Sequence, residues 1–83
     1  MNGSANTKPS VAYADGFFIV SFEGGASMRF PVEGNPRLAA GSPDQLSHVV
    51  VSHFGIHWPD LDEDLSFEGL ARGDYGQRAF QPV

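Results

Sequence analysis

The first third of the chain alternates apolar and polar side chains with a period of two, which is the pattern of β-strands with one buried face. Three such segments cover residues 11–14, 17–22 and 27–32, and an Asp-Gly turn and a Glu-Gly-Gly turn separate them. Glycine accepts the positive φ that tight turns require. The pattern therefore predicts a three-stranded antiparallel meander with residues 17–22 as its central strand.

The predicted central strand is apolar on both of its faces. Phe18, Val20 and Phe22 share one face, and we assign them to the core. Phe17 and Ile19 share the other face. In so short a protein, either helices cover this second face or it carries a partner, which includes a second copy of the chain.

Helix signals follow the meander. Asn35 precedes a proline and predicts the cap of a short helix over residues 36–40. Ser42 precedes a second proline, and Gln45 lies three residues further on, which is the pattern of a capping box. Apolar residues at helical spacing then predict that this second helix packs on the sheet: Leu46, Val49 and Val50.

The last third of the chain predicts one more strand and one more helix. Residues 54–58 predict a short fourth strand ended by proline, and residues 60–65 form an acidic turn. Ser66 predicts the cap of a short helix through Arg72, and Gly73 ends it. The fold class is therefore α+β: a three-stranded antiparallel β-meander followed by a helix, a short fourth strand and a short C-terminal helix.

A length of 83 residues allows one domain. Residues 1–9 and 74–83 show no apolar period, so we expect a disordered N-terminal tail and a flexible C-terminal tail around a single domain over residues 10–73.

Composition narrows the classes of partner. Five Lys and Arg against ten Asp and Glu give a formal net charge of −5, and the basic residues are scattered. Because affinity for nucleic acid comes from Lys and Arg that neutralise phosphates, we expect no direct nucleic-acid binding. An acidic face that meets a basic protein is the better expectation.

The chain has no cysteine, which excludes disulfides, thiolate metal sites and a cysteine nucleophile. Its apolar runs are far too short to cross a bilayer, and residues 1–10 lack the apolar stretch of a signal peptide. We therefore expect a cytoplasmic protein that does not associate with a membrane.

Two groups of residues suggest metal chemistry. His53 and His57, with Asp60 or Asp62, are of the types that bind zinc, and Asp-x-Asp-x-Asp at residues 60–64 matches the start of a calcium loop. The sixth and twelfth positions of that loop are a leucine and an alanine, where glycine and glutamate are needed. We predict no metal and no cofactor, and we keep a metal- or small-ligand-binding domain that uses His53, His57 and the acidic turn as an alternative.

No pattern of a catalytic site is present. The serines show no nucleophile elbow, and no glycine-rich turn leads into a helix with a lysine. A chain of this size also has little room for an enclosed pocket. We predict that the protein is not an enzyme and has no catalytic residues.

The stretch GIHWPDLDEDLSFEGL, residues 55–70, resembles the C-terminal signature of the Domain of Unknown Function 2442 family. Phe-Pro-Val at residues 30–32 and Asn-Pro-Arg-Leu-Ala at residues 35–39 resemble the strand end and the Pro-Arg-Leu helix of that family. The chain departs from the family pattern at Gly34-Asn35, where the family commonly has bulkier residues, and at Phe54, where it commonly has a small residue. The resemblance implies a small bacterial or phage α+β domain, in some members encoded beside a second small protein in a toxin–antitoxin-like arrangement. It implies no catalytic residue.

These observations favour a non-enzymatic protein–protein interaction module, either an antitoxin-like or an accessory partner, and a homodimer is a further form of it. A phage-type inhibitor of a host system is another alternative. The candidate partner-binding residues are the second face of the central strand, the tryptophan and the acidic turn: Phe17, Ile19, Trp58, Asp60, Asp62, Glu63 and Asp64.

Overall fold

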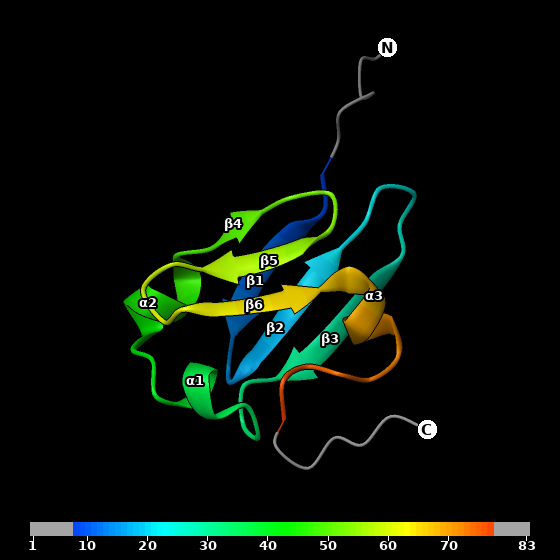
Figure 1. Ribbon diagram of the computed structural model, residues 1–83. Coiled ribbons are helices and arrows are strands. Elements are labelled where there is room, and N and C mark those ends of the chain that lie inside the picture. Colours follow the sequence, from blue (N-terminus) through cyan, green and yellow to red (C-terminus); the bar gives the residue numbers. More distant parts are fainter. Residues whose placement is uncertain (1–7, 78–83) are drawn as a thin grey trace.

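Two three-stranded antiparallel sheets pack face to face in the computed structural model, which describes residues 8–77 (Figure 1). The first sheet has the order β1-β2-β3, with β1 at Ser10–Ala14, β2 at Phe17–Ser21 and β3 at Ser27–Pro31. This is the predicted meander, and β2 is its central strand. The α+β class predicted from the sequence is confirmed.

The β1–β2 hairpin has the two-residue turn that its sequence predicts. Asp15 and Gly16 have φ angles of 52° and 83°. Positive φ at both central residues matches the right-handed twist of the strands, and it pairs Ala14 with Phe17 across the turn. At the far edge, β3 ends at Pro31, as expected of a residue that cannot donate to a ladder.

Short helices follow, each with its predicted cap. In α1, Pro36–Ala39, the Asn35 side chain accepts hydrogen bonds from two backbone amides of the first turn. In α2, Pro43–Ser47, Ser42 and Gln45 form both bonds of a capping box. The later helix α3, Phe67–Ala71, is capped by Ser66.

The predicted extent of the second helix is wrong. It ends at Ser47, and His48 already has extended backbone angles. Val50 and Val51 instead form the strand β4. Three successive valines explain the change, because a β-branched side chain is stiff in a helix and fits the pleated surface of a sheet.

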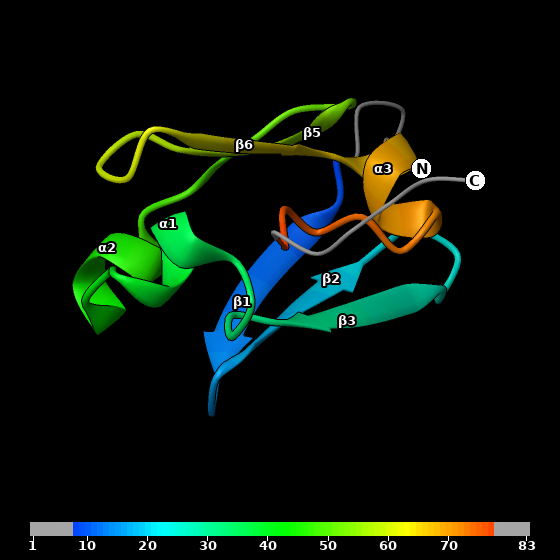
Figure 2. The ribbon, with the colours of Figure 1, turned by 60° about the horizontal axis from the view of Figure 1, so that its bottom comes forward.

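A second sheet, β4-β5-β6, therefore covers the meander where a helix was expected (Figure 2). Strand β5, Gly55–Trp58, is the predicted fourth strand, and β6, Glu63–Ser66, arises from the second half of the predicted acidic turn. Residues 59–62 alone make the turn. Helices α1 and α2 lie at one end of the two layers and α3 at the other, while the outer face of β1-β2-β3 carries no other described element (Figure 2).

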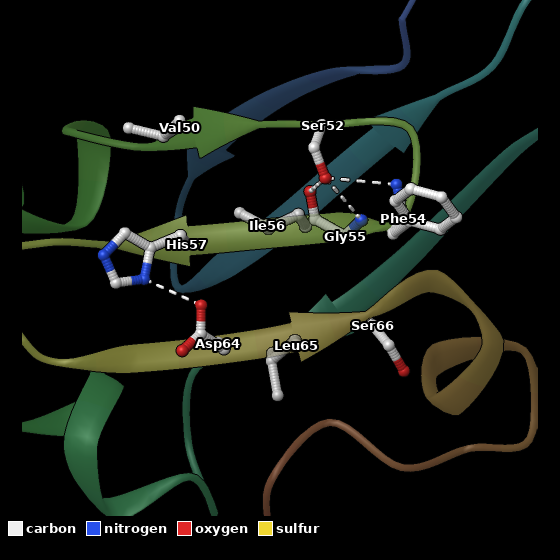
Figure 3. Close-up of a pocket in the computed structure, with 9 residues that line it drawn as sticks. All are labelled: Val50, Ser52, Phe54, Gly55, Ile56, His57, Asp64, Leu65 and Ser66. Carbon is white, nitrogen blue, oxygen red and sulfur yellow. Dashed lines mark hydrogen bonds and ion pairs between the residues drawn. The ribbon is translucent and has the colours of Figure 1, made fainter.

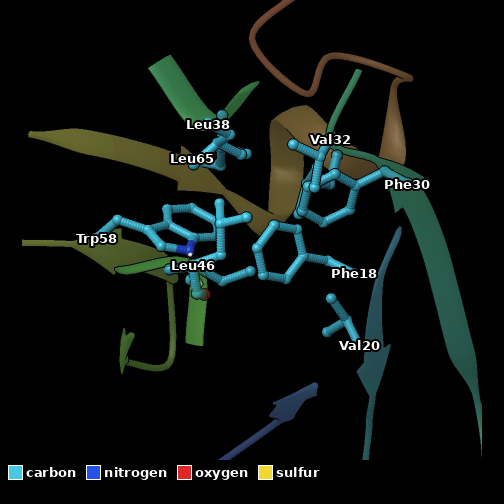
Figure 4. Close-up of a cluster of buried hydrophobic side chains, with 10 residues drawn as sticks. Phe18, Val20, Phe30, Val32, Leu38, Leu46, Trp58 and Leu65 are labelled. Carbon is cyan, nitrogen blue, oxygen red and sulfur yellow. Dashed lines mark hydrogen bonds between the residues drawn. The ribbon is translucent and has the colours of Figure 1, made fainter. Parts of the chain in front are cut away.

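The core lies between the two sheets and contains the side chains that face each other across them (Figure 4). Phe18 and Trp58 are fully buried, and their rings meet edge to face at 5.1 Å between centroids. The indole Nε1 of Trp58 donates to the backbone oxygen of Leu46 at 3.1 Å, so the one polar atom of this ring is satisfied. Leu46 therefore joins α2 to the same core.

A second connection runs through the buried amide of Asn35. Its Oδ1 caps α1, accepting from the amides of Arg37 and Leu38, and its Nδ2 donates to Glu63 Oε2 at 2.9 Å and to the backbone oxygen of Tyr75 at 2.7 Å. Both donors and both acceptor positions of the side chain are used. One residue thus ties α1, β6 and the segment after α3 together.

The segment after α3 packs on the domain as far as it is described. The ring of Tyr75 stacks on Phe30 at 6.1 Å between centroids, and Gln77 bonds to the backbone of Tyr75 and Gly73. Residues 74–77 belong to the part that the sequence led us to expect as a flexible tail. The rest of that tail, residues 78–83, and residues 1–7 of the predicted N-terminal tail lie outside the described residues. Within residues 8–77, no helix has the length and apolar character needed to span a membrane.

We predict that Trp58→Phe lowers the free energy of unfolding by about 2 kcal/mol, because it shrinks a buried ring and leaves the Leu46 carbonyl without its donor. Urea denaturation followed by circular dichroism measures this. Phe54→Leu is the matched control at an exposed aromatic and should stay within about 0.5 kcal/mol of the wild type. Equal losses for both variants would contradict the assigned core.

We predict that Asn35→Asp costs about 2–4 kcal/mol, although aspartate caps a helix as well as asparagine does. The change places a carboxylate oxygen against Glu63 and the Tyr75 carbonyl, where the structure has a donor. Ser42→Ala, which removes an exposed cap alone, should cost only about 1 kcal/mol. The same denaturation series compares them, and a smaller loss for Asn35→Asp than for Ser42→Ala would show that the cap is all that matters.

Candidate functional site

The hairpin between β4 and β5 holds an exposed aromatic side chain on a fixed backbone. Ser52 Oγ accepts hydrogen bonds from the amides of Phe54 and Gly55 at 3.1 and 3.2 Å, and the Ser52 amide donates to the Gly55 oxygen at 2.9 Å. The Phe54 oxygen accepts from the amide of Phe67 at 2.8 Å. The backbone of Phe54 is thus bonded on both sides, while 83% of the residue is exposed.

A shallow hollow lies beside Phe54 on the outer face of the second sheet (Figure 3). Three of the residues that line it pair directly across the strands, one from each strand: Val50, His57 and Asp64. Val50 is 54% exposed, and it and Phe54 are the exposed large hydrophobic residues of the described chain. The remaining lining comes from the strand backbones and the hairpin: Ser52, Gly55, Ile56, Leu65 and Ser66.

Gly55 forms the floor of this hollow. A Cβ atom at this position would overlap the backbone oxygen of Leu65 and lie 3.0 Å from the Cα of Ser66. The strands β5 and β6 can approach in this register only because the residue is glycine. The same missing side chain leaves the space between Phe54 and Ser66 open (Figure 3).

The polar side of the hollow is one hydrogen-bonded pair of side chains. Nδ1 of His57 lies 2.7 Å from Oδ1 of Asp64, and their side chains are 42% and 76% exposed. A pair this exposed contributes about 0–1 kcal/mol to stability. It leaves carboxylate oxygen atoms open to solvent beside an apolar surface.

The remaining acidic residues of this region pair with separate partners. Nδ1 of His48 lies 2.7 Å from Asp60 Oδ2, and Nη1 of Arg37 lies 3.8 Å from Asp62 Oδ2. Glu63 is bound to Asn35, as described above. The acids therefore gather around the β5–β6 turn and β6, next to the hollow.

The four residues considered for metal binding are not brought together. His57 contacts Asp64, Asp60 contacts His48, Asp62 contacts Arg37, and His53 is exposed in the hairpin loop. Within residues 8–77, no group of three or more histidine or acidic side chains is placed to hold a metal ion.

The candidate partner-binding residues lie on three different parts of the fold. Phe17 and Ile19 face outward from the first sheet, where the guanidinium of Arg29 sits 4.5 Å above the Phe17 ring. Trp58 is fully buried between the sheets. The acidic turn joins β5 and β6 in the second sheet, the layer opposite β1-β2-β3 (Figure 2).

The sequence analysis did not identify Phe54 and Val50 as site residues, since it assigned one to a strand and the other to a helix. From sequence alone an apolar residue is assigned to the core, because its exposure depends on strand pairings that the sequence does not show. The departure from the family pattern at Phe54 was the one signal that pointed to it.

The chain is similar to known proteins in sequence and in fold. A family model described as a protein of unknown function (DUF2442) matches residues 9–76. A crystal structure of a protein of unknown function from Rhodospirillum rubrum has a TM-score of 0.73 and 32% sequence identity to the chain, and the match covers 92% of this chain and 100% of that one. No curated protein matches the sequence.

We predict that Gly55→Ala costs about 1–3 kcal/mol, because the added methyl group forces β5 and β6 apart. His57→Ala changes the residue two positions further along β5, on the same face, without adding atoms between the strands, so it should cost under about 1 kcal/mol. Thermal unfolding measured by calorimetry compares the two. If Gly55→Ala is as stable as the wild type, the register of β5 against β6 is wrong.

Proposed function

The chain belongs to the DUF2442 family of proteins of unknown function, and from this premise we propose that it is a non-enzymatic interaction module that docks a protein partner on the outer face of β4-β5-β6. The partner carries an apolar side chain that packs beside Phe54 and basic side chains that meet Asp64 of β6 and the aspartates of the adjacent turn. An antitoxin-like or accessory protein binds a small basic partner in this way.

The observation that carries the proposal is the exposure of Phe54 on a fixed backbone. An aromatic ring in water costs solvation free energy, and nothing in the described fold gains from its position. Aromatic residues supply much of the affinity at protein interfaces, and a preset backbone lowers the entropy lost on binding. Val50, at the other end of the hollow, is a second exposed apolar side chain on the same surface (Figure 3).

The acidic residues around the hollow favour a basic partner. Asp64 lies in the hollow itself, and Asp60 and Asp62 lie at the adjacent turn. With a net charge of −5, the chain attracts basic proteins over a Debye length of about 8 Å at physiological salt and repels acidic ones. An apolar centre with a charged border is the usual arrangement of a protein interface.

A binding role fits the site better than catalysis does. The His57–Asp64 pair lies on an open sheet face with both side chains in contact with solvent. Catalytic groups act in sites that exclude water, where electrostatic interactions are strong. The absence of cysteine supports a cytoplasmic location for this partnership.

We predict that Phe54→Ser weakens binding of the natural partner by about 30-fold, which corresponds to about 2 kcal/mol. The tagged full chain is expressed in its host, stoichiometric partners are identified by mass spectrometry, and affinities are then measured by calorimetry with the purified partner.

Asp64→Asn should weaken binding severalfold and reduce the salt dependence of the affinity. Glu23→Gln is the matched control: it makes the same charge change at an exposed turn of the first sheet and should have no effect. A partner that binds Phe54→Ser as tightly as the wild type, or the lack of any stoichiometric partner, would refute the proposal.

A further inference from the structure

The free edge of β4 differs from the other sheet edges of the described chain. Edge strands are normally protected by charge, proline or a covering element. The edge strand β3 carries Arg29 and Pro31, β6 carries Glu63 and Asp64, and α2 lies against β1. Residues 49–52, which contain β4, have no charge and no proline and include three valines.

The pairing of β4 with β5 determines which backbone groups face this free edge. The bond from the Ser52 amide to the Gly55 oxygen marks a hydrogen-bonded pair, and such pairs alternate along an antiparallel ladder. The backbone groups of Ser52 and Val50 therefore point towards β5, while those of Val49 and Val51 point away from it. The two outward-pointing residues can bond another strand.

This edge is complementary to itself. If two copies pair antiparallel with the two Val50 residues opposite each other, Val49 of each copy meets Val51 of the other. Each of these two pairs exchanges two backbone hydrogen bonds, and the Val50 side chains meet across the two-fold axis, where neighbouring side chains are closest. The exposed half of Val50 is then buried against its symmetry mate.

Charge limits self-association of the chain to a neutral part of its surface, and this edge is such a part. Two molecules of charge −5 repel each other over most of their surfaces. Residues 49–52 contribute no charge to the contact, and a symmetric interface uses one patch twice.

We infer that the chain forms a two-fold symmetric dimer in which β4 pairs with β4 of a second copy, so that the two outer sheets become one six-stranded sheet. The dimer also brings the two hollows with their Phe54 side chains onto one continuous surface. This inference does not rest on the proposed partner: Val50 belongs to both surfaces, but the dimer requires the edge of β4, whereas the partner requires the ring of Phe54.

Charges placed at the two-fold axis test the inference. Val50→Lys and Val50→Glu each put like charges opposite each other, and each should weaken self-association at least tenfold in sedimentation equilibrium of the full chain. An equimolar mixture of the two variants should restore dimers, because opposite charges then meet at the axis. Ser27→Lys and Ser27→Glu make the same charge changes on the exposed surface of β3 and should dimerise as the wild type does.

Amide hydrogen exchange gives the second measurement. The amides of Val49 and Val51 should become protected as the protein concentration rises, whereas the amide of Val50 bonds within the monomer and should be protected at every concentration.

Two results would overturn the inference. The first is a wild-type chain that stays monomeric up to about 1 mM, because a dimer with a weaker dissociation constant would not form at cellular concentrations. A dimer that survives both Val50 variants also overturns it, because it uses another surface. Phe54→Ser should leave dimerisation unchanged, so a failure of this inference and a failure of the proposed partner site remain distinguishable.

Discussion

The contact between Phe18 and Trp58 holds the two sheets together, and the rest of the structure depends on it. Neither three-stranded sheet has a core of its own, because each has one apolar face that must be covered. Phe18 lies at the centre of the first sheet and Trp58 at the end of β5, and both are fully buried. An edge-to-face aromatic pair contributes about 0.5–1.5 kcal/mol beyond the burial of its area. Since a domain of this size has a net stability of only about 3–5 kcal/mol, one such contact is a large part of the total.

Asn35 fixes the elements that the aromatic core does not reach. A buried amide with unbonded polar atoms destabilises a fold, so its four bonds must form together or the burial is unfavourable. This requirement explains how the segment at Tyr75 becomes part of the domain although it has no regular structure. Asn35 also engages Glu63, which the sequence analysis placed among the candidate partner-binding residues. Its carboxylate is committed to Asn35 and to the backbone of its neighbour, and only the acids beyond it remain available to a partner.

The sequence predicts this fold where the signal is local. The alternation through β2, the Asp-Gly turn, and the caps at Asn35, Ser42 and Ser66 each depend on residues within four positions of one another, and all are found as expected. The second sheet could not be predicted as a whole, because β4 has only 2 residues and β5 and β6 have 4 each, which is too few to establish an alternating pattern. Val50 fits a helical face by spacing and a strand by its branched side chain, and only the available partner strand, β5, decides between them.

The candidate site was hidden for the same reason. Whether an apolar residue is exposed depends on which neighbours the fold supplies, and Phe54 and Val50 became surface residues only when β4 paired with β5 and turned them outward. The core explains neither position, since the buried set between the sheets is complete without them. Natural surfaces contain scattered apolar residues at little cost, but Phe54 and Val50 line the same hollow, which has an acidic border. A position that costs solvation and adds nothing to packing is best explained by binding. For this reason we propose the exposed face of the second sheet, and not the more apolar core segments, as the binding surface of the domain.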